Sequence, residues 1–206
     1  MVSPKHRSAQ VKRETRETKV ELSLNLDKSE GSQIQTGVGF FDHMLDALSK
    51  HSRIGLQINA VGDLHVDQHH LVEDVGIALG TAFREALGDD LRIRRFSSAY
   101  APLDEALARV VIDISGRPYL HFAVDISAKR VGEFDADLVE EFYRAFVTNA
   151  GINLHADLIH ASNAHHQIEP LFKATALALR AAVEREGGLK DVPSTKGTLS
   201  EKAARK

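Results

Sequence analysis

Two kinds of hydrophobic pattern alternate along this chain. Residues 20–26 and 55–61 alternate apolar and polar side chains with a period of two, which predicts half-buried strands. Residues 40–52 and 69–87 place apolar side chains three and four positions apart, which predicts amphipathic helices. A turn-forming stretch after the first strand predicts a short return strand at 32–36. The order of elements is therefore strand, strand, helix, strand, helix.

The second half of the chain repeats this order. The same patterns predict strands at 108–114, 119–126 and 152–159, and helices at 137–149 and 165–186. When His43 is aligned with Glu141, Ile54 falls on Ile152, so the two halves match residue by residue. A β-β-α-β-α unit used twice predicts an α+β fold with sheet on one face and helices on the other.

The repeat also predicts the domain organisation. We expect a first repeat half at 10–98 and a second at 99–187. The polar stretches at 1–9 and 188–206 are expected to be flexible ends.

Composition narrows the classes of function. The 206 residues are 43% hydrophobic and 27% charged with a net charge of −3, which is typical of a globular domain and argues against a nucleic-acid or membrane-surface protein. The sequence has no long apolar run and no apolar segment near its start, so we expect a cytoplasmic protein. It contains no cysteine, so any metal must be held by imidazole and carboxylate groups.

Four of the eleven histidines belong to a motif, His-His-x-x-Glu, that occurs at 69–73 and again at 165–169. Residues three or four apart share a helix face, whereas adjacent residues point about 100° apart. The glutamate can therefore join one histidine on a metal, and the other histidine is placed for a second ion. One motif alone could be a solvated helix start, but its duplication favours a site for Mn, Fe, Co or Zn. His43, on the helix before the first motif, is a further candidate ligand.

Other residues add a second kind of candidate chemistry. Lys173 lies one helical turn beyond Glu169, on the same face as the second motif. Cations near a metal suit a phosphorylated substrate. The role of His155 stays open, because the corresponding position in the first half is Gln57.

Several stretches, in the same order, resemble the imidazoleglycerol-phosphate dehydratase family of histidine biosynthesis. The resemblance covers nearly the whole chain, from about Arg13 to Lys196. It is carried by Arg16-Glu17-Thr18, by residues 37–45 (GVGFFDHML), 67–76 (DQHHLVEDVG), 94–96 (RRF), 102–106 (PLDEA) and 115–119 (SGRPY), and by 163–169 (NAHHQIE), 172–174 (FKA) and 193–197 (PSTKG).

The resemblance implies a duplicated fold similar to the second domain of ribosomal protein S5. It implies a hydro-lyase that converts D-erythro-imidazole-glycerol phosphate to imidazole-acetol phosphate and water. Two divalent metal ions per active site, usually manganese, would stabilise an imidazolate form of the substrate. The sites would be shared between subunits of a homo-oligomer of about 24 copies.

Residue roles follow from the same resemblance. Glu17 would be the carboxylate that transfers protons. The phosphate would be held by Arg95, Arg117, Lys173, Ser194 and Lys196, with residues 194–196 ordered at the site. The metal ligands would be His43, His69, His70, Glu73, His165, His166 and Glu169. Many members read Glu-His-Phe-Phe where this chain reads Glu140-Glu141-Phe142-Tyr143, so Glu141 is expected to face a metal in place of histidine.

Two other functions use the same features. A two-metal phosphohydrolase would need similar ligands and a similar phosphate grip, and it would release inorganic phosphate. A metal-buffering protein would also use many histidines. Its histidines would be expected in tracts at flexible ends, whereas here the motifs begin helices inside a duplicated core.

Overall fold

The computed structural model describes residues 7–28, 31–88 and 92–186. The first half forms a four-stranded sheet and two helices: β1 (Ser8–Glu14), β2 (Thr18–Asn25), β3 (Gln33–Gln35), α1 (Gly39–Ser52), β4 (Gly55–Gly62) and α2 (His69–Leu87). The second half repeats this with β5 (Phe96–Leu103), β6 (Ala106–Asp113), β7 (Tyr119–Ala123), α3 (Leu138–Ala150), β10 (Asn153–His160) and α4 (Ala164–Ala182). A small hairpin, β8 (Arg130–Val131) and β9 (Phe134–Asp135), precedes α3.

The two four-stranded sheets have the same topology, with the orders β1-β2-β4-β3 and β5-β6-β10-β7. In each sheet, the short strand runs parallel to the central strand beside it, as β3 does with β4. The expectation that residues 32–36 return along β2 is therefore wrong. The reason is that β1 and β4 already occupy the two edges of β2, so β3 can pair only at the outer edge of β4.

The expected β-β-α-β-α unit lacks the first strand of each half. β1 was not predicted because its sequence, SAQVKRE, contains no fully buried residue and so carries little hydrophobic signal. The expectation of a flexible end at 1–9 is wrong for residues 7–9, since Ser8 begins β1 and Arg7 is buried against Asp27. The expected boundary between residues 98 and 99 falls inside β5, which begins at Phe96.

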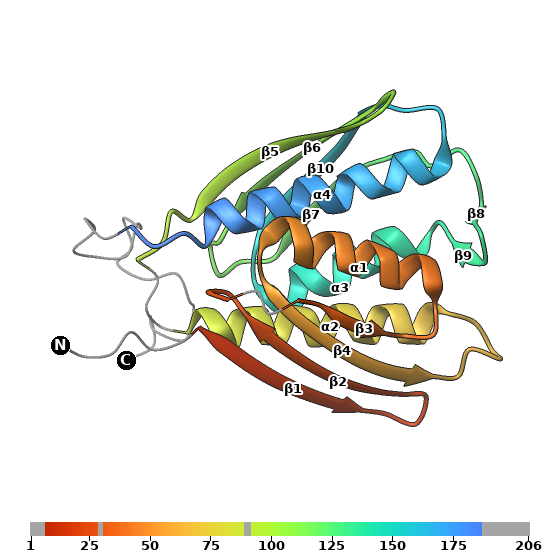
Figure 1. The fold of residues 1–206 in the computed structure, drawn as a ribbon, viewed down its shortest axis with the longest axis horizontal. Coiled ribbons are helices and arrows are strands. Elements are labelled where there is room, and N and C mark those ends of the chain that lie inside the picture. The colour runs from red at the N-terminus through yellow and green to blue at the C-terminus, as the bar shows by residue number, and fades with distance from the viewer. Residues whose placement is uncertain (1–6, 29–30, 89–91, 187–206) are drawn as a thin grey trace.

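Each half has a sheet with helices on one face, as expected, and the two halves pack with their helices inward. Figure 1 shows the resulting layers, with the two sheets outside and the four helices between them. α2 packs mainly on α3, and α1 packs on α4, so every helix meets a helix of the other half. The contact between α2 and α3 depends on Gly80, because a Cβ atom there would lie 2.5 Å from the carbonyl oxygen of Phe146.

All four helices begin at the same end of the molecule, the right-hand end in Figure 1. The Phe40 ring near the start of α1 lies 5.2 Å from the His165 ring of α4, and Phe41 lies 5.3 Å from Phe142 of α3. The turn between β1 and β2 lies at this same end. The fold therefore gathers both histidine motifs at one end, which we call the motif end.

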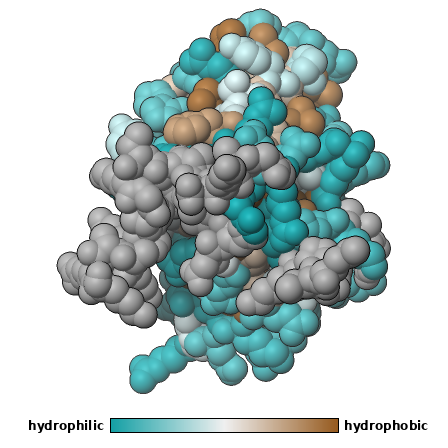
Figure 2. All heavy atoms as spheres, turned by 90° about the vertical axis from the view of Figure 1, so that its left-hand side faces the viewer, coloured by the Kyte–Doolittle hydropathy of each residue, from teal (hydrophilic) through white to brown (hydrophobic). Residues whose placement is uncertain are grey.

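The opposite end carries the last turns of the helices and faces the viewer in Figure 2. Its described residues are mostly hydrophilic over the middle, and apolar residues gather toward the top, on the side of the second sheet. Phe96, Tyr100 and Tyr119 of that sheet are exposed. Within the described ranges, no helix is both long and apolar enough to cross a membrane.

Candidate metal centre and active site

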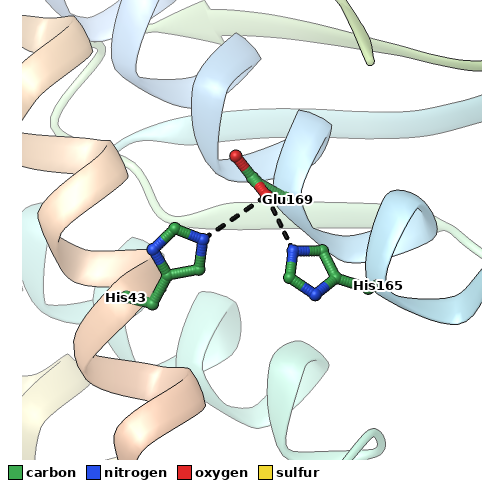
Figure 3. A group of neighbouring side chains, drawn as sticks. All are labelled: His43, His165 and Glu169. Atoms are coloured by element: carbon green, nitrogen blue, oxygen red, sulfur yellow. Dashed lines mark hydrogen bonds and ion pairs between the residues drawn. The ribbon is translucent and has the colours of Figure 1, made fainter. Parts of the chain in front are cut away.

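Three candidate ligands meet at the motif end, as Figure 3 shows. His165 and Glu169 come from successive turns of α4, and their Nε2 and Oε2 atoms are 2.8 Å apart. His43 of α1 points at the same carboxylate oxygen, with its Nε2 atom 3.5 Å away. The ligand atoms of all three residues lie within 4.8 Å of one another. Two imidazoles and one carboxylate form a donor set that fits Mn, Fe, Co or Zn.

His43 was expected as an extra ligand on the helix that precedes the first motif. Its partners belong to the second motif because α1 packs on α4 rather than on α2. The duplication makes α2 and α3 the equivalent pair, which places Glu141 of α3 opposite the first motif. Each candidate site thus combines a helix of one half with a helix of the other.

Lys173 lies beside the group of three ligands. Its Nζ atom is 2.6 Å from Oε1 of Glu169, and both side chains are largely buried. Burial raises the pKa of Glu169, but the hydrogen bonds from Lys173 and His165 outweigh it and lower the pKa to about 2. The carboxylate is therefore ionised at neutral pH, as a metal ligand must be.

The second histidine of each motif points away from the first, as the helical spacing predicts. The rings of His165 and His166 are nearly perpendicular, with an interplanar angle of 89°, and those of His69 and His70 make an angle of 83°. Nδ1 of His166 is 2.8 Å from the carboxylate of Glu105.

His70 has a matching partner in the first half, since its Nδ1 atom lies 3.1 Å from Oδ2 of Asp63. The hydrogen bonds that His70 and His166 donate to Asp63 and Glu105 raise the pKa values of the two histidines. In the other direction, the hydrogen bond from His166 and those from backbone amides hold the pKa of Glu105 well below its usual range.

The first motif does not form an equivalent group within one chain. Among the described residues, the set on α1 and α4 is the one place where three such ligand atoms lie close together. His69, Glu73 and Glu141 are partly buried at the same end of the molecule, and Glu141 lies 3.8 Å from Arg144. Their role as ligands stays a prediction.

Glu17 lies in the turn between β1 and β2, and its Oε2 atom is 3.8 Å from Nδ1 of His70. The turn is held by the hydroxyl of Thr15, which accepts hydrogen bonds from the backbone amides of Glu17 and Thr18. Thr18 donates to the buried carboxylate of Asp74, which anchors the turn to α2. The structure thus brings the expected proton-transfer residue to the first motif.

Sequence reasoning named no role for Asp63, Asp74 or Glu105. Asp74 and Glu105 lie inside stretches that carry the family resemblance, and the repeat places Glu105 opposite Glu17. That correspondence was the available signal. Asp63 gave none, because its contact with His70 depends on how the loop after β4 folds.

Of the expected phosphate ligands that the structure describes, the two arginines lie far from Lys173 within one chain. Arg95 lies beside the C-terminal end of α4, where its backbone amide donates to the carbonyl of Ala182. Its side chain pairs with Asp113 at 2.7 Å. Arg117 is exposed in the turn between β6 and β7, also at that end. With a rise of 1.5 Å per residue, Ala182 lies about 25 Å along α4 from His165. Ser194 and Lys196 lie outside the described residues.

His155 is not part of the group on α1 and α4. It lies on β10, where its ring packs 5.2 Å from His121 and 5.6 Å from Tyr119. His121 is half exposed, and its Nε2 atom lies 4.0 Å from Asp157.

Comparison with known proteins now decides the family. A family profile described as imidazoleglycerol-phosphate dehydratase matches residues 36–179. The chain belongs to the imidazoleglycerol-phosphate dehydratase family. The enzyme of that name from Methylobacillus flagellatus is 55% identical over 194 residues, which cover 94% of this chain and 98% of the relative. The one from Thiobacillus denitrificans is 57% identical over 194 residues, covering 94% of this chain and 100% of the relative.

Solved structures agree with this family in fold. The imidazoleglycerol-phosphate dehydratase of Staphylococcus aureus superposes with a TM-score of 0.80 at 44% identity, covering 87% of this chain and 99% of that chain. The structure from Pyrococcus furiosus also gives a TM-score of 0.80, at 34% identity, covering 92% of this chain and 100% of that chain. The expected α+β fold and the expected family are therefore confirmed.

The family is one of dehydratases, that is, hydro-lyases, in histidine biosynthesis. The identity over nearly the full chain leaves no support for a phosphohydrolase or a metal buffer. Within this dehydratase family, the cluster of His43, His165 and Glu169 is a candidate metal-binding group.

Proposed function

We propose that this protein removes water from D-erythro-imidazole-glycerol phosphate to give imidazole-acetol phosphate, using two divalent metal ions, preferably Mn²⁺, at a site shared between subunits. The observation that carries the proposal is the convergence of His43, His165 and Glu169 in a chain of this family. Neutral imidazoles and an ionised carboxylate are the forms that bind such a metal.

The duplication supports two metal sites rather than one. His43, His165 and Glu169 would hold one ion, and Glu141, His69 and Glu73 are their counterparts in the repeat. His70 and His166 point away from their neighbours, so they would complete these sites from an adjacent subunit. The carboxylate of Glu141 would give its site one more negative charge than the histidine that many family members carry.

The phosphate ligands support a site shared between copies. Lys173 lies midway along α4 and its Nζ atom reaches back to Glu169, whereas Arg95 and Arg117 are at the opposite end, about 20 Å along α4 from Glu169. A small phosphorylated imidazole cannot span that distance. The arginines would therefore act on a substrate held at the motif end of another copy. Ser194 and Lys196 would join the same phosphate. A homo-oligomer follows from this division, and we propose about 24 subunits.

Bound metal would act as a Lewis acid that stabilises negative charge on the imidazole ring of the substrate. The chain itself supplies the proton transfer and the positioning. Glu17 would move the proton, since its carboxylate is half exposed at the motif end and is held on a turn that Asp74 anchors. Lys173 would hold the phosphate and keep Glu169 ionised. The expected cytoplasmic location stays a prediction.

Metal removal and one substitution test this function. Protein stripped by a chelator should form no ketone product, and added Mn²⁺ should restore activity without release of inorganic phosphate. Glu17→Gln should lower turnover at least 100-fold because the proton-transfer group is lost, while Mn²⁺ binding stays unchanged. Glu21→Gln, which removes a surface carboxylate paired with Lys12, is the matched control and should remain active. Full activity of the metal-free protein would refute the proposal.

A further inference from the structure

Glu105 occupies the position in the second half that Glu17 occupies in the first. β2 and β6 have the same length and place in their sheets, and each glutamate directly precedes its strand. Each also faces Nδ1 of the second histidine of a motif: Glu17 is 3.8 Å from His70, and Glu105 is 2.8 Å from His166. The duplication therefore produced two carboxylates at equivalent places beside the candidate site.

The surroundings of these two carboxylates differ. Oε1 of Glu105 accepts hydrogen bonds from the backbone amide of Ser162 at 3.2 Å, the hydroxyl of Ser162 at 3.0 Å and the backbone amide of Asn163 at 3.0 Å. Its Oε2 atom faces His166. Among the described residues, the carboxylate of Glu17 forms an ion pair only with His70. Glu17 is thus available to move protons, whereas both oxygens of Glu105 are occupied.

The contact with Glu105 determines which nitrogen of His166 carries the proton. A carboxylate that accepts two backbone N–H groups is ionised and can only accept hydrogen bonds. Nδ1 of His166 must therefore carry a hydrogen, and the neutral ring keeps its lone pair on Nε2, on the side away from Glu105. Asp63 makes the same contact with Nδ1 of His70 in the first half.

We propose that Glu105 is a positioning residue that fixes the ring of His166 with Nε2 free to bind metal. This inference rests on the proposed function, in which His166 completes a metal site with an adjacent subunit. Carboxylates that accept from the second nitrogen of a ligating histidine orient the ring and increase its basicity. Asp63 does the same for His70. Both repeats therefore contain a carboxylate that orients the second histidine of the motif, although the two carboxylates come from different loops.

Glu105 also holds the start of α4, and this second contribution must be separated from the first. It binds the backbone amide of Asn163, and the side chain of Asn163 caps the helix by accepting from the amides of His165 at 2.9 Å and His166 at 3.3 Å. A merely structural role would act through this cap. The proposed role acts through the imidazole of His166.

Glu105→Gln distinguishes the two roles. The amide oxygen can keep the three hydrogen bonds to Ser162 and Asn163, which leaves the NH₂ group facing Nδ1 of His166. The reverse orientation is disfavoured because it points the NH₂ group at two backbone N–H donors. His166 must then accept at Nδ1 and carry its proton on Nε2, which blocks metal binding.

The measurement is a titration of the assembled, chelator-treated protein with Mn²⁺, in which electron paramagnetic resonance reports the free ion. Glu105→Gln should weaken binding of one Mn²⁺ per chain by about 10- to 100-fold, as Glu105→Ala should. The melting temperature of metal-free Glu105→Gln should equal that of the wild type. Glu21→Gln serves as the control for loss of a surface carboxylate and should bind like the wild type.

A double variant completes the test. If Glu105 acts through His166, adding Glu105→Ala to His166→Ala should weaken Mn²⁺ binding no further. Wild-type affinity in Glu105→Gln, or additive losses in the double variant, would overturn the inference and leave the proposed function standing. Wild-type protein that binds no Mn²⁺ would contradict the proposed function and this inference together.

Discussion

Replacing Glu169 by glutamine tests the centre of the candidate site with little change in shape. One carboxylate oxygen of Glu169 faces His165 at 2.8 Å and His43 at 3.5 Å, and the other pairs with Lys173 at 2.6 Å. The side chain is only 12% exposed, so these contacts define its surroundings. Glutamine keeps the size of the group but removes the negative charge that a divalent ion requires.

The expected loss of metal affinity is larger than the loss caused by replacing a residue that only hydrogen-bonds to a metal ligand. Mutating a residue that hydrogen-bonds to a metal ligand lowers metal affinity by about 10- to 100-fold. Removing a ligand itself should therefore lower the affinity by more than about 100-fold, or about 2.8 kcal/mol. The stability of the metal-free protein should change less. Lys173 is 20% exposed and can hydrate when its partner is neutral, so we expect about 1 kcal/mol, or about 2–4 °C in melting temperature.

Four measurements separate these effects. Mn²⁺ titration should show one weakened ion per chain, the dehydration assay should show no turnover, and sedimentation velocity should show weaker assembly. Thermal unfolding of the metal-free variant should stay close to the wild type. Glu21→Gln, far from the site, should behave as the wild type in all four measurements. If Glu169→Gln keeps full turnover and normal Mn²⁺ affinity, the assignment of this group as a metal site is wrong.

Two further predictions concern pH and helix packing. Because hydrogen bonds to carboxylates raise the pKa values of His70 and His166, protons should compete with metal above the usual histidine range, and Mn²⁺ affinity should fall steadily as the pH is lowered from about 8 to about 6. Affinity independent of pH would argue against both ligands. Gly80→Ala should destabilise the protein by about 1–3 kcal/mol in urea unfolding, despite the higher helix propensity of alanine, since the new methyl group meets the backbone of Phe146. Gly39→Ala, at an open position, is its control and should cost nothing; equal stabilities of the two variants would contradict the packing argument.

The sequence by itself determined most of the local structure. The spacing of apolar residues predicted a helix at 69–87, and the structure has α2 at His69–Leu87. The same reasoning found all four helices and the duplication, because the periods of helices and half-buried strands are local properties of the chain. It also predicted that adjacent histidines diverge, since the angle between them depends only on helix geometry.

Other features depend on which faces meet across the chain. β1 and β5 are edge strands, and the weak hydrophobic pattern of β1 gave no signal until its pairing with β2 was known. No local pattern shows that α1 packs on α4, yet this contact determines which motif His43 joins.

The surroundings of the candidate ligands were likewise decided by tertiary structure. Glu105 reaches His166 only because β6 and the start of α4 lie side by side, although 61 positions separate the two residues. Arg95 lies at the far end of α4 because α2 ends at that end of the molecule and β5 begins there. Such contacts result from burying the inner faces of both sheets against the helices, and this burial is a property of the whole fold rather than of any segment.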